Sequence, residues 1–504
     1  MCGSGRLRQV PDEVDAGFVA VIDAGVAGDS GTVVIEPAVD AGPTTADARV
    51  VIIDAGVRDA GPMACIPNEG LCVGSVAQVC TPDGQGFVAD VTTTGCEFWP
   101  AILGQQLFGY VGHNTYAVAI ANAGLRSSSV TIEGGMLTSP LTISVPPQSV
   151  SVQSLSDRAA QIPFRLRATW PVSVVQFNPL FQKVGTVSTH SCDASLLRPT
   201  HTWGRQYVVA SWPVFSTSPG LIGVVTREAT TLTITPRAAT VARNGAPALA
   251  ANVASTLTLD AGVFLELGTL SGDLTGTLIS ADHPIEVIGG HNGAKIPADI
   301  DASDHLEEGL MPIEQLSNEY FVISPALVAI PAGKAQIVRI IAAENDLELS
   351  YEPPRLGAPT HLEHAGDFIE LDPGSAVFRV QSTKKVLVAQ YMQAQALGGA
   401  MGDPSMFIAP PRSQFKTDHV FHSPPDYEMN AVDIVAPTGT TVTLDGAAVS
   451  GFVSIGSTDH GLSRNLSLGL GQAANGTHRV TCSAPCMLSV YGYGQYISYW
   501  YPGN

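Results

Sequence analysis

The chain has 504 residues, a formal net charge of −20 and only 14% charged residues. This acidic balance argues against a nucleic-acid partner or an anionic membrane surface, because binding to phosphates needs clustered cations. The sequence has no run of about 18 apolar residues, so we expect no transmembrane helix. Glycine (51) and proline (35) are abundant, which favours turns and short strands over long helices.

Residues 1–63 predict a disordered acidic stalk. Asp-Ala-Gly recurs five times and aromatic residues are nearly absent, so the segment lacks the apolar surface needed to fold. Cys2, followed by Gly3 and Ser4, resembles the acylated first residue of a bacterial lipoprotein. Such an anchor would tether the chain to a membrane without a spanning helix. The alternative is an incidental cysteine close to a true start.

Residues 64–98 predict a small module held by two disulfides. Its cysteines are Cys65, Cys72, Cys80 and Cys96. Their spacings do not match the closely spaced pairs of zinc sites, and the segment is too short for a good core. Four cysteines allow three pairings, so the connectivity stays open. Cys482 and Cys486 are candidates for a third bond, and disulfides indicate an exported, oxidising location.

Residues 99–504 predict β-structure throughout, because short Val/Ile/Thr/Tyr runs alternate with Gly, Pro, Asn and Asp turns. Two elements recur about every 100 residues. The first is an aromatic strand followed by a threonine-rich hairpin, which begins at Phe108, Trp203, Asn318 and Lys416. The second is an apolar strand at the end of each copy, in which Gln176, Ile288, Ala389 and Val490 occupy comparable positions. The fold class is therefore all-β, with tandem β-sandwich-like units after the stalk and the disulfide-knotted segment. We expect four units, at 99–190, 191–300, 301–400 and 401–504.

Several strings in this part occur in the order typical of one known family. They are DASLLRPTHTWGRQYVVASWP from Asp193, SADHPIEVIGGHNGAKIP from Ser280, DASDHLEEGLMPIEQLSNEYFV from Asp301, GDPSMFIAPPRSQF from Gly402 and the terminal YGYGQYISYWYPG. Residues 105–504 thus resemble the N-terminal domain of IgG Fc-binding proteins, which occurs in mucus-associated animal proteins and in bacterial surface proteins. The resemblance implies a surface-displayed, non-catalytic binding or adhesive module.

Two strings supply candidates for a ligand surface. THTWGR brings together His201, Trp203 and Arg205, where exposed aromatic and guanidinium groups would contact a protein or a sugar. The alternative is that Trp203 belongs to the core and His201 to a turn. DHLEEG adds His305, together with the neighbouring pair Glu307 and Glu308.

Asp299, Asp301 and Asp304 are weak candidates for a calcium site, because closely spaced carboxylates supply hard oxygen ligands. A structural turn is the alternative. The sequence has no nucleophile elbow, phosphate-binding loop or His-Glu-x-x-His motif, so we expect no enzyme and no cofactor.

These observations predict an exported protein, either anchored to the outer membrane at the cell surface or extracellular. Its function would be adhesion or recognition of an unknown protein or glycan by a β-rich head. It would contact no nucleic acid, and would meet a membrane only through the lipid anchor. The alternatives are a structural component of a surface assembly and an exported glycan hydrolase.

Overall fold

The computed structural model describes residues 65–503 apart from 68, 82, 106–112, 156–161, 185–186, 189–191, 301, 326–335, 395–400, 426, 472–474 and 495–496. The predicted stalk, with Cys2, lies outside the described residues. The regular elements of the described part are strands and three short 3-10 helices, which confirms the all-β class. No helix in these ranges is long and apolar enough to cross a membrane.

The cysteine module is a three-stranded antiparallel sheet. It consists of β1 (Gly70–Val73), β2 (Val76–Cys80) and β3 (Phe87–Ala89). Two disulfides hold it, Cys65–Cys80 and Cys72–Cys96. The second bond joins β1 covalently to β4 (Gly95–Phe98), which is the first strand of the next sheet. The module is thus fixed to the remainder of the protein by a covalent bond.

Four larger antiparallel sheets follow, and we call them repeats 1 to 4. Repeat 1 contains β4, β5 (His113–Asn122), β6 (Ser128–Gly134), β7 (Leu141–Val145), β8 (Ser149–Ser154), β9 (Phe164–Val184), β10 (Val187–Ser188) and β11 (Ala194–Leu196). Repeat 2 contains η1 (Thr200–Thr202), β12 (Gly204–Val208), β13 (Gly220–Thr226), β14 (Thr230–Thr235), β15 (Ser255–Leu259), β16 (Phe264–Thr269), β17 (Leu278–Ala294) and β18 (Asp304–Gly309).

Repeat 3 contains η2 (Ile313–Gln315), β19 (Ser317–Val322), β20 (Gln336–Ala342), β21 (Leu347–Glu352), β22 (His361–Leu362), β23 (Phe368–Gly374), β24 (Phe378–Met392) and β25 (Ser405–Ile408). Repeat 4 contains η3 (Arg412–Gln414), β26 (Lys416–His422), β27 (Met429–Pro437), β28 (Val442–Leu444), β29 (Ala447–Ala448), β30 (Val453–Ser454), β31 (His460–Ser467), β32 (Thr477–Gly494) and β33 (Ile497–Pro502).

All four repeats are built on one long strand, which is β9, β17, β24 or β32. The strand order is β7-β6-β9-β5-β8 in repeat 1, and repeats 2 to 4 follow the same plan, with β30 added at the edge of repeat 4. The long strand also pairs with an opening strand (β4, β12, β19, β26) and a closing strand (β11, β18, β25, β33). The local sequence fits these roles: β6 alternates buried and accessible residues, as expected for a strand with one face in a core.

A bulge recurs at one position of each long strand. In repeat 1, Gly95 pairs with Val172 and Glu97 pairs with Arg167. A step of two residues in the opening strand thus corresponds to a step of five residues in the long strand. The same register shift occurs in the other repeats, at Gly204, Ser317 and Lys416. In repeat 4 the Cys482–Cys486 disulfide brackets this bulge. Bulges bend strands, and these allow each long strand to take part in both halves of its repeat.

The pairings differ from the expected unit boundaries. Closing strands β11, β18 and β25 lie beyond 190, 300 and 400, yet each pairs with the long strand before it. The opening strand of repeat 1 is β4 at Gly95, whereas the expected start at Phe108 falls outside the described residues. The aromatic run after Phe108 contributes β5 instead, whose counterparts are β13, β20 and β27. The sequence placed the start of repeat 1 at β5 instead of at the opening strand, because the two strands have similar apolar alternation.

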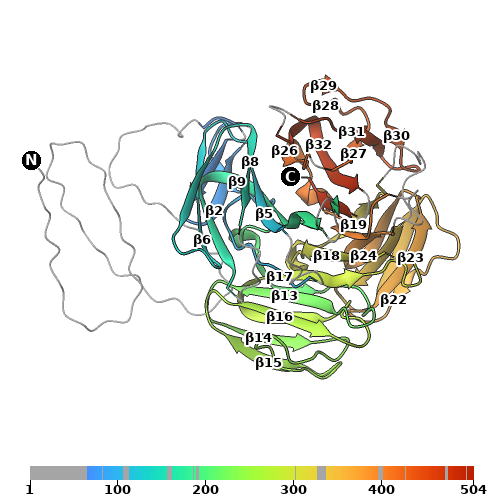
Figure 1. Ribbon diagram of the computed structural model, residues 1–504. Helices are drawn as coiled ribbons and strands as arrows, with labels where there is room; N and C mark the ends of the chain where they lie inside the picture. Colours follow the sequence, from blue (N-terminus) through green and yellow to red (C-terminus); the bar gives the residue numbers. More distant parts are fainter. Residues whose placement is uncertain are drawn as a thin grey trace, which may run out of the picture. The chain divides into compact units, whose positions relative to one another are not determined.

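The repeats form a closed ring, seen in Figure 1 as the cyan, green, orange and red parts of the ribbon. The closing strands meet at its centre: β11 contacts β18, β18 contacts β25, β25 contacts β33, and β33 contacts β11. Three of the large apolar clusters are shared by adjacent repeats, namely 2 with 3, 3 with 4, and 4 with 1. Closure between repeats 4 and 1 uses Phe177, whose ring meets His422, Tyr499 and Tyr501 edge to face. Neighbouring repeats therefore stabilise each other.

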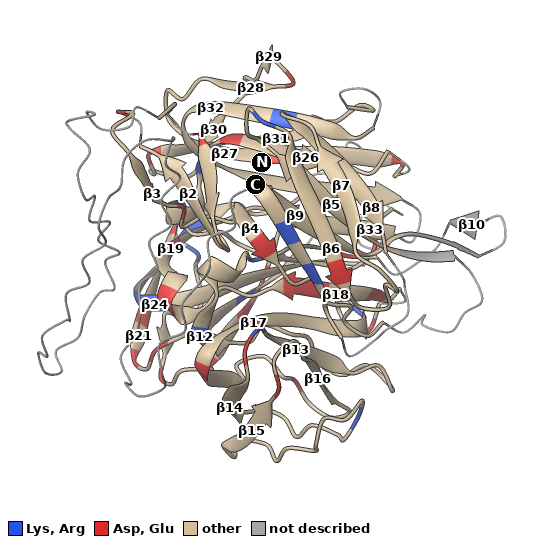
Figure 2. Cartoon of the chain, turned by 90° about the vertical axis from the view of Figure 1, so that its left-hand side faces the viewer, with Lys and Arg blue, Asp and Glu red and all other residues tan. Residues whose placement is uncertain are grey.

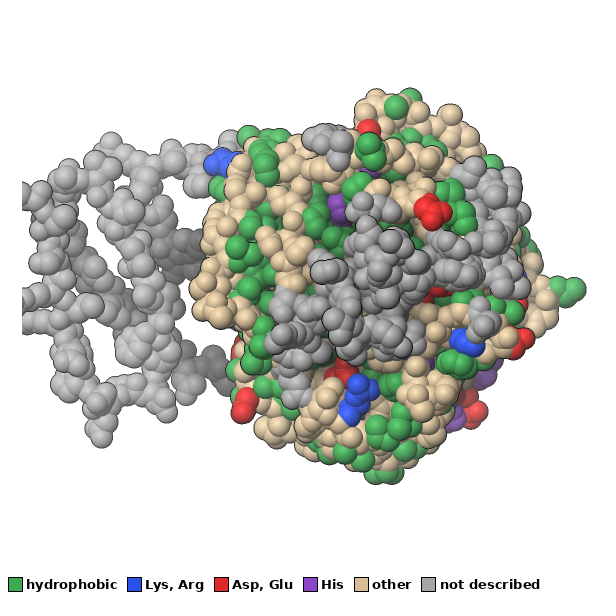
Figure 3. All heavy atoms as spheres, in the orientation of Figure 1, with side chains coloured by type: hydrophobic (Ala, Val, Ile, Leu, Met, Phe, Trp, Pro, Cys, Tyr) green, Lys and Arg blue, Asp and Glu red, His purple; other side chains and the backbone are tan. Residues whose placement is uncertain are grey.

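Charged side chains are sparse over this ring. Figure 2 shows the strands mostly without acidic or basic residues. The face in Figure 3 consists mainly of hydrophobic and uncharged polar groups, with isolated charges between them. Charged residues do gather at two places, which are a surface cleft and the centre of the ring.

Candidate binding cleft

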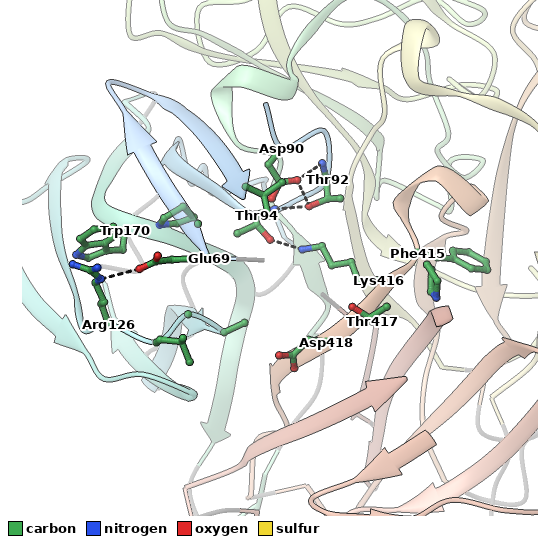
Figure 4. A pocket seen from close by; sticks show the side chains of 17 residues that line it. Glu69, Asp90, Thr92, Thr94, Arg126, Trp170, Phe415, Lys416, Thr417 and Asp418 are labelled. Carbon is green, nitrogen blue, oxygen red and sulfur yellow. Dashed lines mark hydrogen bonds and ion pairs between the residues drawn. The ribbon is translucent and has the colours of Figure 1, made fainter. Parts of the chain in front are cut away.

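A cleft of about 340 Å³ lies where the cysteine module, repeat 1 and repeat 4 meet (Figure 4). The module contributes residues of β1, β2 and the segment after β3. Repeat 1 contributes the 123–126 turn and the bulge residues Trp170 and Pro171, and repeat 4 contributes the start of β26 and Pro485. The bulges of repeats 1 and 4 thus form opposite parts of the lining, and the cysteine module forms a third part.

Trp170 and Arg126 form one wall of the cleft. The Arg126 guanidinium lies 4.7 Å from the centre of the Trp170 ring, a cation–π contact. Its Nε donates a hydrogen bond to Glu69 Oε1 at 2.9 Å, which connects repeat 1 to the cysteine module. Leu125 beside them is 62% exposed. An aromatic ring, a cation and an exposed leucine are groups that often anchor a bound partner.

Lys416 forms the opposite wall. Its Nζ donates a hydrogen bond to Thr94 Oγ1. Burial lowers the pKa of Lys416 to about 8, although the carboxylates of Asp90 and Asp418 oppose this change. Lys416 is half-buried, so contact of its amine with a ligand would cost little further desolvation.

The carboxylates of the cleft are already engaged. Asp418 receives two hydrogen bonds from Arg479, at 2.8 and 2.7 Å. Asp90 accepts from both the backbone and the hydroxyl of Thr92. Glu69 is held by Arg126, as described above. These contacts suit a pre-formed recognition surface, because the charged groups are positioned before any partner arrives.

The THTWGR residues lie near this cleft but have different roles. His201 Nε2 contacts the backbone oxygen of Asp90 at 2.7 Å, so it fixes the cysteine module to repeat 2. Burial lowers the pKa of His201. Trp203 is 7% exposed and donates to Arg198 O at 2.9 Å, which places it in the core. Of the three, Arg205 alone is exposed.

His305, Glu307 and Glu308 lie inside the protein, which corrects the expectation that they form a ligand surface. They belong to β18, which is buried along its whole length because it is one of the four central strands. Glu307 accepts hydrogen bonds from Gln176 at 3.0 Å and Asn178 at 2.9 Å. Its Oε2 also lies 3.2 Å from His305 Nε2. This cluster connects repeats 1 and 2 at the ring centre.

The sequence did not single out other members of the central cluster. Asp193 accepts from Ser405 Oγ at 2.6 Å and from the backbone of Met406 and Glu307. Burial raises the pKa of Glu308 well above its ordinary value, and the nearby Asp193 adds to the effect. The signal in the sequence was polar Gln176 and Asn178 within the apolar run PVSVVQFNPL.

The weak calcium candidates do not form a site in the described residues. Asp304 is buried and its Oδ1 accepts from the backbone N–H of His305, whereas Asp299 is exposed. Asp301 lies outside the described residues. No group of three His, Cys, Asp or Glu in the described part of the chain is arranged to hold a metal.

The family model described as IgGFc binding protein matches residues 193–492, which is 300 of the 504 residues. The chain belongs to the IgGFc binding protein family. The match begins at the central Asp193 and ends within β32 of repeat 4, a narrower range than the expected 105–504. No curated protein sequence matches the chain. The IgGFc binding protein family is one of binding proteins, not a known enzyme family.

Proposed function

We propose that this IgGFc binding protein family member is an extracellular, non-catalytic recognition protein that holds a partner protein in the cleft of Figure 4. The observation that carries the proposal is the cleft itself. It combines the half-buried Trp170, the exposed Leu125 and the desolvated Lys416 on walls that disulfides and ion pairs hold in place. Three disulfides support an oxidising location outside the cytosol.

A protein is favoured over a glycan as the partner for two reasons. The family name refers to the Fc part of immunoglobulin G, a protein ligand. The lining also mixes acidic, basic and apolar groups, which is typical of protein interfaces with a few strong anchors. Adhesion between cells is the setting that we infer for such recognition, with the N-terminal segment as a tether.

The test uses the full chain with a panel of immobilised extracellular proteins, immunoglobulin Fc among them, and a glycan array. Trp170→Ala and Leu125→Ala are expected to weaken binding of the selected partner at least about tenfold, as loss of an interface anchor does. Leu270→Ala is the matched control, because Leu270 is 51% exposed and does not line the cleft. Unchanged affinity in both cleft variants would remove the cleft from the proposal.

Catalysis has a separate test. The full chain is incubated with peptide and polysaccharide libraries, and products are detected by mass spectrometry. We expect no turnover. Products that disappear when Asp90 or Asp418 is replaced by asparagine would replace the recognition proposal with a hydrolase.

A further inference from the structure

A second cavity, separate from the cleft of Figure 4, lies between repeats 3 and 4. Its volume is about 500 Å³, within the range of small-molecule sites. Its apolar walls come from both repeats and consist of Pro353, Val377, Val453, Ile455, Leu462 and Leu466. Serine and glycine residues fill most of the remaining lining. Such a lining suits a ligand that is mainly hydrocarbon.

The cavity exists because repeat 4 has an element that the other repeats lack among the described residues. Strand β30 extends the edge of this sheet beyond β31, with Val453 opposite Leu462 and Ser454 opposite Gly461. In Figure 1, β30 and β31 lie on the side of repeat 4 that faces repeat 3. Val453 is 71% exposed at this strand, so the apolar lining continues to the protein surface. A ligand therefore has an apolar way in.

Arg464 is the one charged residue in the described lining. Its Nη2 donates to the backbone oxygen of Ser324 at 2.6 Å, and no carboxylate among the described residues lies within ion-pair distance of it. Burial raises the pKa of the nearby Asp433 to about 6, with Arg464 acting in the opposite direction. The Asp433 carboxyl group is held instead by Asn465 N at 2.6 Å and Tyr491 OH at 2.7 Å.

An arginine that has no salt-bridge partner among the described residues, beside an apolar cavity, indicates which ligand chemistry the cavity would suit. The guanidinium fork matches a carboxylate in shape and charge, and the pairing is strong where water is partly excluded. In the cleft of Figure 4, by contrast, Arg126 already has Glu69. We propose that the cavity between repeats 3 and 4 binds an unbranched aliphatic chain that ends in a carboxylate, with Arg464 as the residue that recognises the carboxylate.

The proposal is tested by calorimetric titration of the full chain with octanoate, decanoate and dodecanoate, each below its micelle concentration. Affinity is expected to rise about fourfold for each added methylene group, the gain typical of buried hydrocarbon. Decanol has the same chain without the charge and is expected to bind about tenfold more weakly than decanoate. A peptide that ends in leucine with a free α-carboxylate distinguishes a protein terminus from a fatty acid as the source of the carboxylate.

Variants distinguish the contribution of the Arg464 charge to binding from that of the apolar walls. Arg464→Gln is expected to weaken decanoate about tenfold and to leave decanol unchanged. The matched control is Arg412→Gln, which removes a partly exposed arginine of η3 that does not line the cavity. Val453→Trp places a large side chain at an exposed position of the rim and should weaken both ligands. Leu125→Ala, in the other cleft, should leave decanoate binding unchanged.

Three results would overturn the proposal. The first is no heat of binding for any of the carboxylates with the wild-type chain. The second is equal affinity of decanoate for the wild type and Arg464→Gln, with circular dichroism showing that the variant is folded. The third is binding of the leucine-terminated peptide without binding of decanoate, which would assign the cavity to protein termini.

Discussion

Ser405 donates its hydroxyl to Asp193 Oδ1 at 2.6 Å, although the two residues lie 212 positions apart in the sequence. Asp193 comes directly before closing strand β11 of repeat 1, and Ser405 opens closing strand β25 of repeat 3. The same carboxyl group accepts from the backbone of Met406 at 3.0 Å and of Glu307 at 3.2 Å, so one side chain connects three repeats across the centre.

Asp193→Asn is therefore expected to destabilise the ring. The new amide group would face backbone N–H donors with donors of its own, so at least one buried partner loses its acceptor. The free energy of unfolding should fall by about 2–4 kcal/mol. Urea unfolding followed by tryptophan fluorescence measures it. Ser405→Ala, which removes a single neutral donor, should cost only about 1 kcal/mol, and equal losses in both variants would contradict this account.

Arg339 holds repeats 2 and 3 together, and replacing it should show that its shape matters as well as its charge. It is 2% exposed, pairs with Asp273 and Glu370, and lies over the Trp212 ring at 4.2 Å. Arg339→Lys keeps the charge but loses the planar fork and the stacking, so we expect a loss of about 1–3 kcal/mol in unfolding free energy. Arg479→Lys is the exposed control, with an expected loss of at most about 1 kcal/mol.

Glu286 is expected to make the free energy of unfolding depend on pH. Burial raises its pKa from 4.5 to about 8, so the folded chain keeps a proton that the unfolded chain releases above pH 4.5. Its stabilising contribution is thus complete below pH 4.5 and is lost as the pH rises towards 8, by up to about 1.4 kcal/mol per pH unit. Relative to the wild type, Glu286→Gln should become more stable as the pH rises from 5 to 8.

Buried histidines change the free energy of unfolding with pH in the opposite direction. The difference in this free energy between the variant and the wild type is therefore more informative than the wild-type value alone. Burial lowers the pKa of His291 to about 3 and that of His419 and His422 to about 4. These groups stabilise the fold above about pH 6.5 and lose that contribution as the pH falls. Glu363→Gln, at a surface position, is the control for chemical denaturation across this range. A constant difference between Glu286→Gln and wild type would show that Glu286 does not retain its proton.

The disulfides should contribute unequally. Cys72–Cys96 closes a loop of 24 residues and Cys482–Cys486 one of 4. In the chain-entropy account their removal costs about 3.4 and about 1.9 kcal/mol, respectively. Paired Cys→Ala variants, unfolded in urea without reductant, measure the two values. A larger loss at Cys482–Cys486 would mean that strand geometry at the bulge, and not loop entropy, sets its contribution.

The sequence predicted the all-β class and the repetition because both depend on local pattern. Turn residues separate short apolar runs, and the long strands have a similar apolar character in each repeat. Ser195 and Glu308 precede the 3-10 helices η1 and η2 by the same number of residues, and they pair with Gln176 and Gly289, respectively. The sequence therefore placed Ile288 one residue away from the true counterpart of Gln176. Apolar alternation alone does not distinguish neighbouring registers in a strand that is buried on both faces.

The site was harder to predict. Glu307 and Glu308 were expected at the surface because charged residues are rarely buried without partners. Their partners Gln176 and Arg198 come from more than 100 residues earlier in the chain, and only the packing of β18 against repeat 1 at the centre of the ring brings them close. The cleft also depends on distant parts of the chain: Trp170 and Lys416 line the same cleft because repeat 4 returns to repeat 1. Contacts of this kind leave no local periodicity in a single sequence.

The covalent connections of the cysteine module determine how the protein responds to tension. A pull on the N-terminal segment enters the module at Cys65 and reaches β4 through the Cys72–Cys96 bond after seven residues of backbone, instead of thirty-one. The hairpins between these points are bypassed and cannot be drawn out while the bond is intact. The pull then acts on β4, which is hydrogen-bonded to β9 in the body of repeat 1. A tethered molecule would therefore transmit force to its ring almost without lengthening, and reduction of one disulfide would turn this stiff joint into an extensible one.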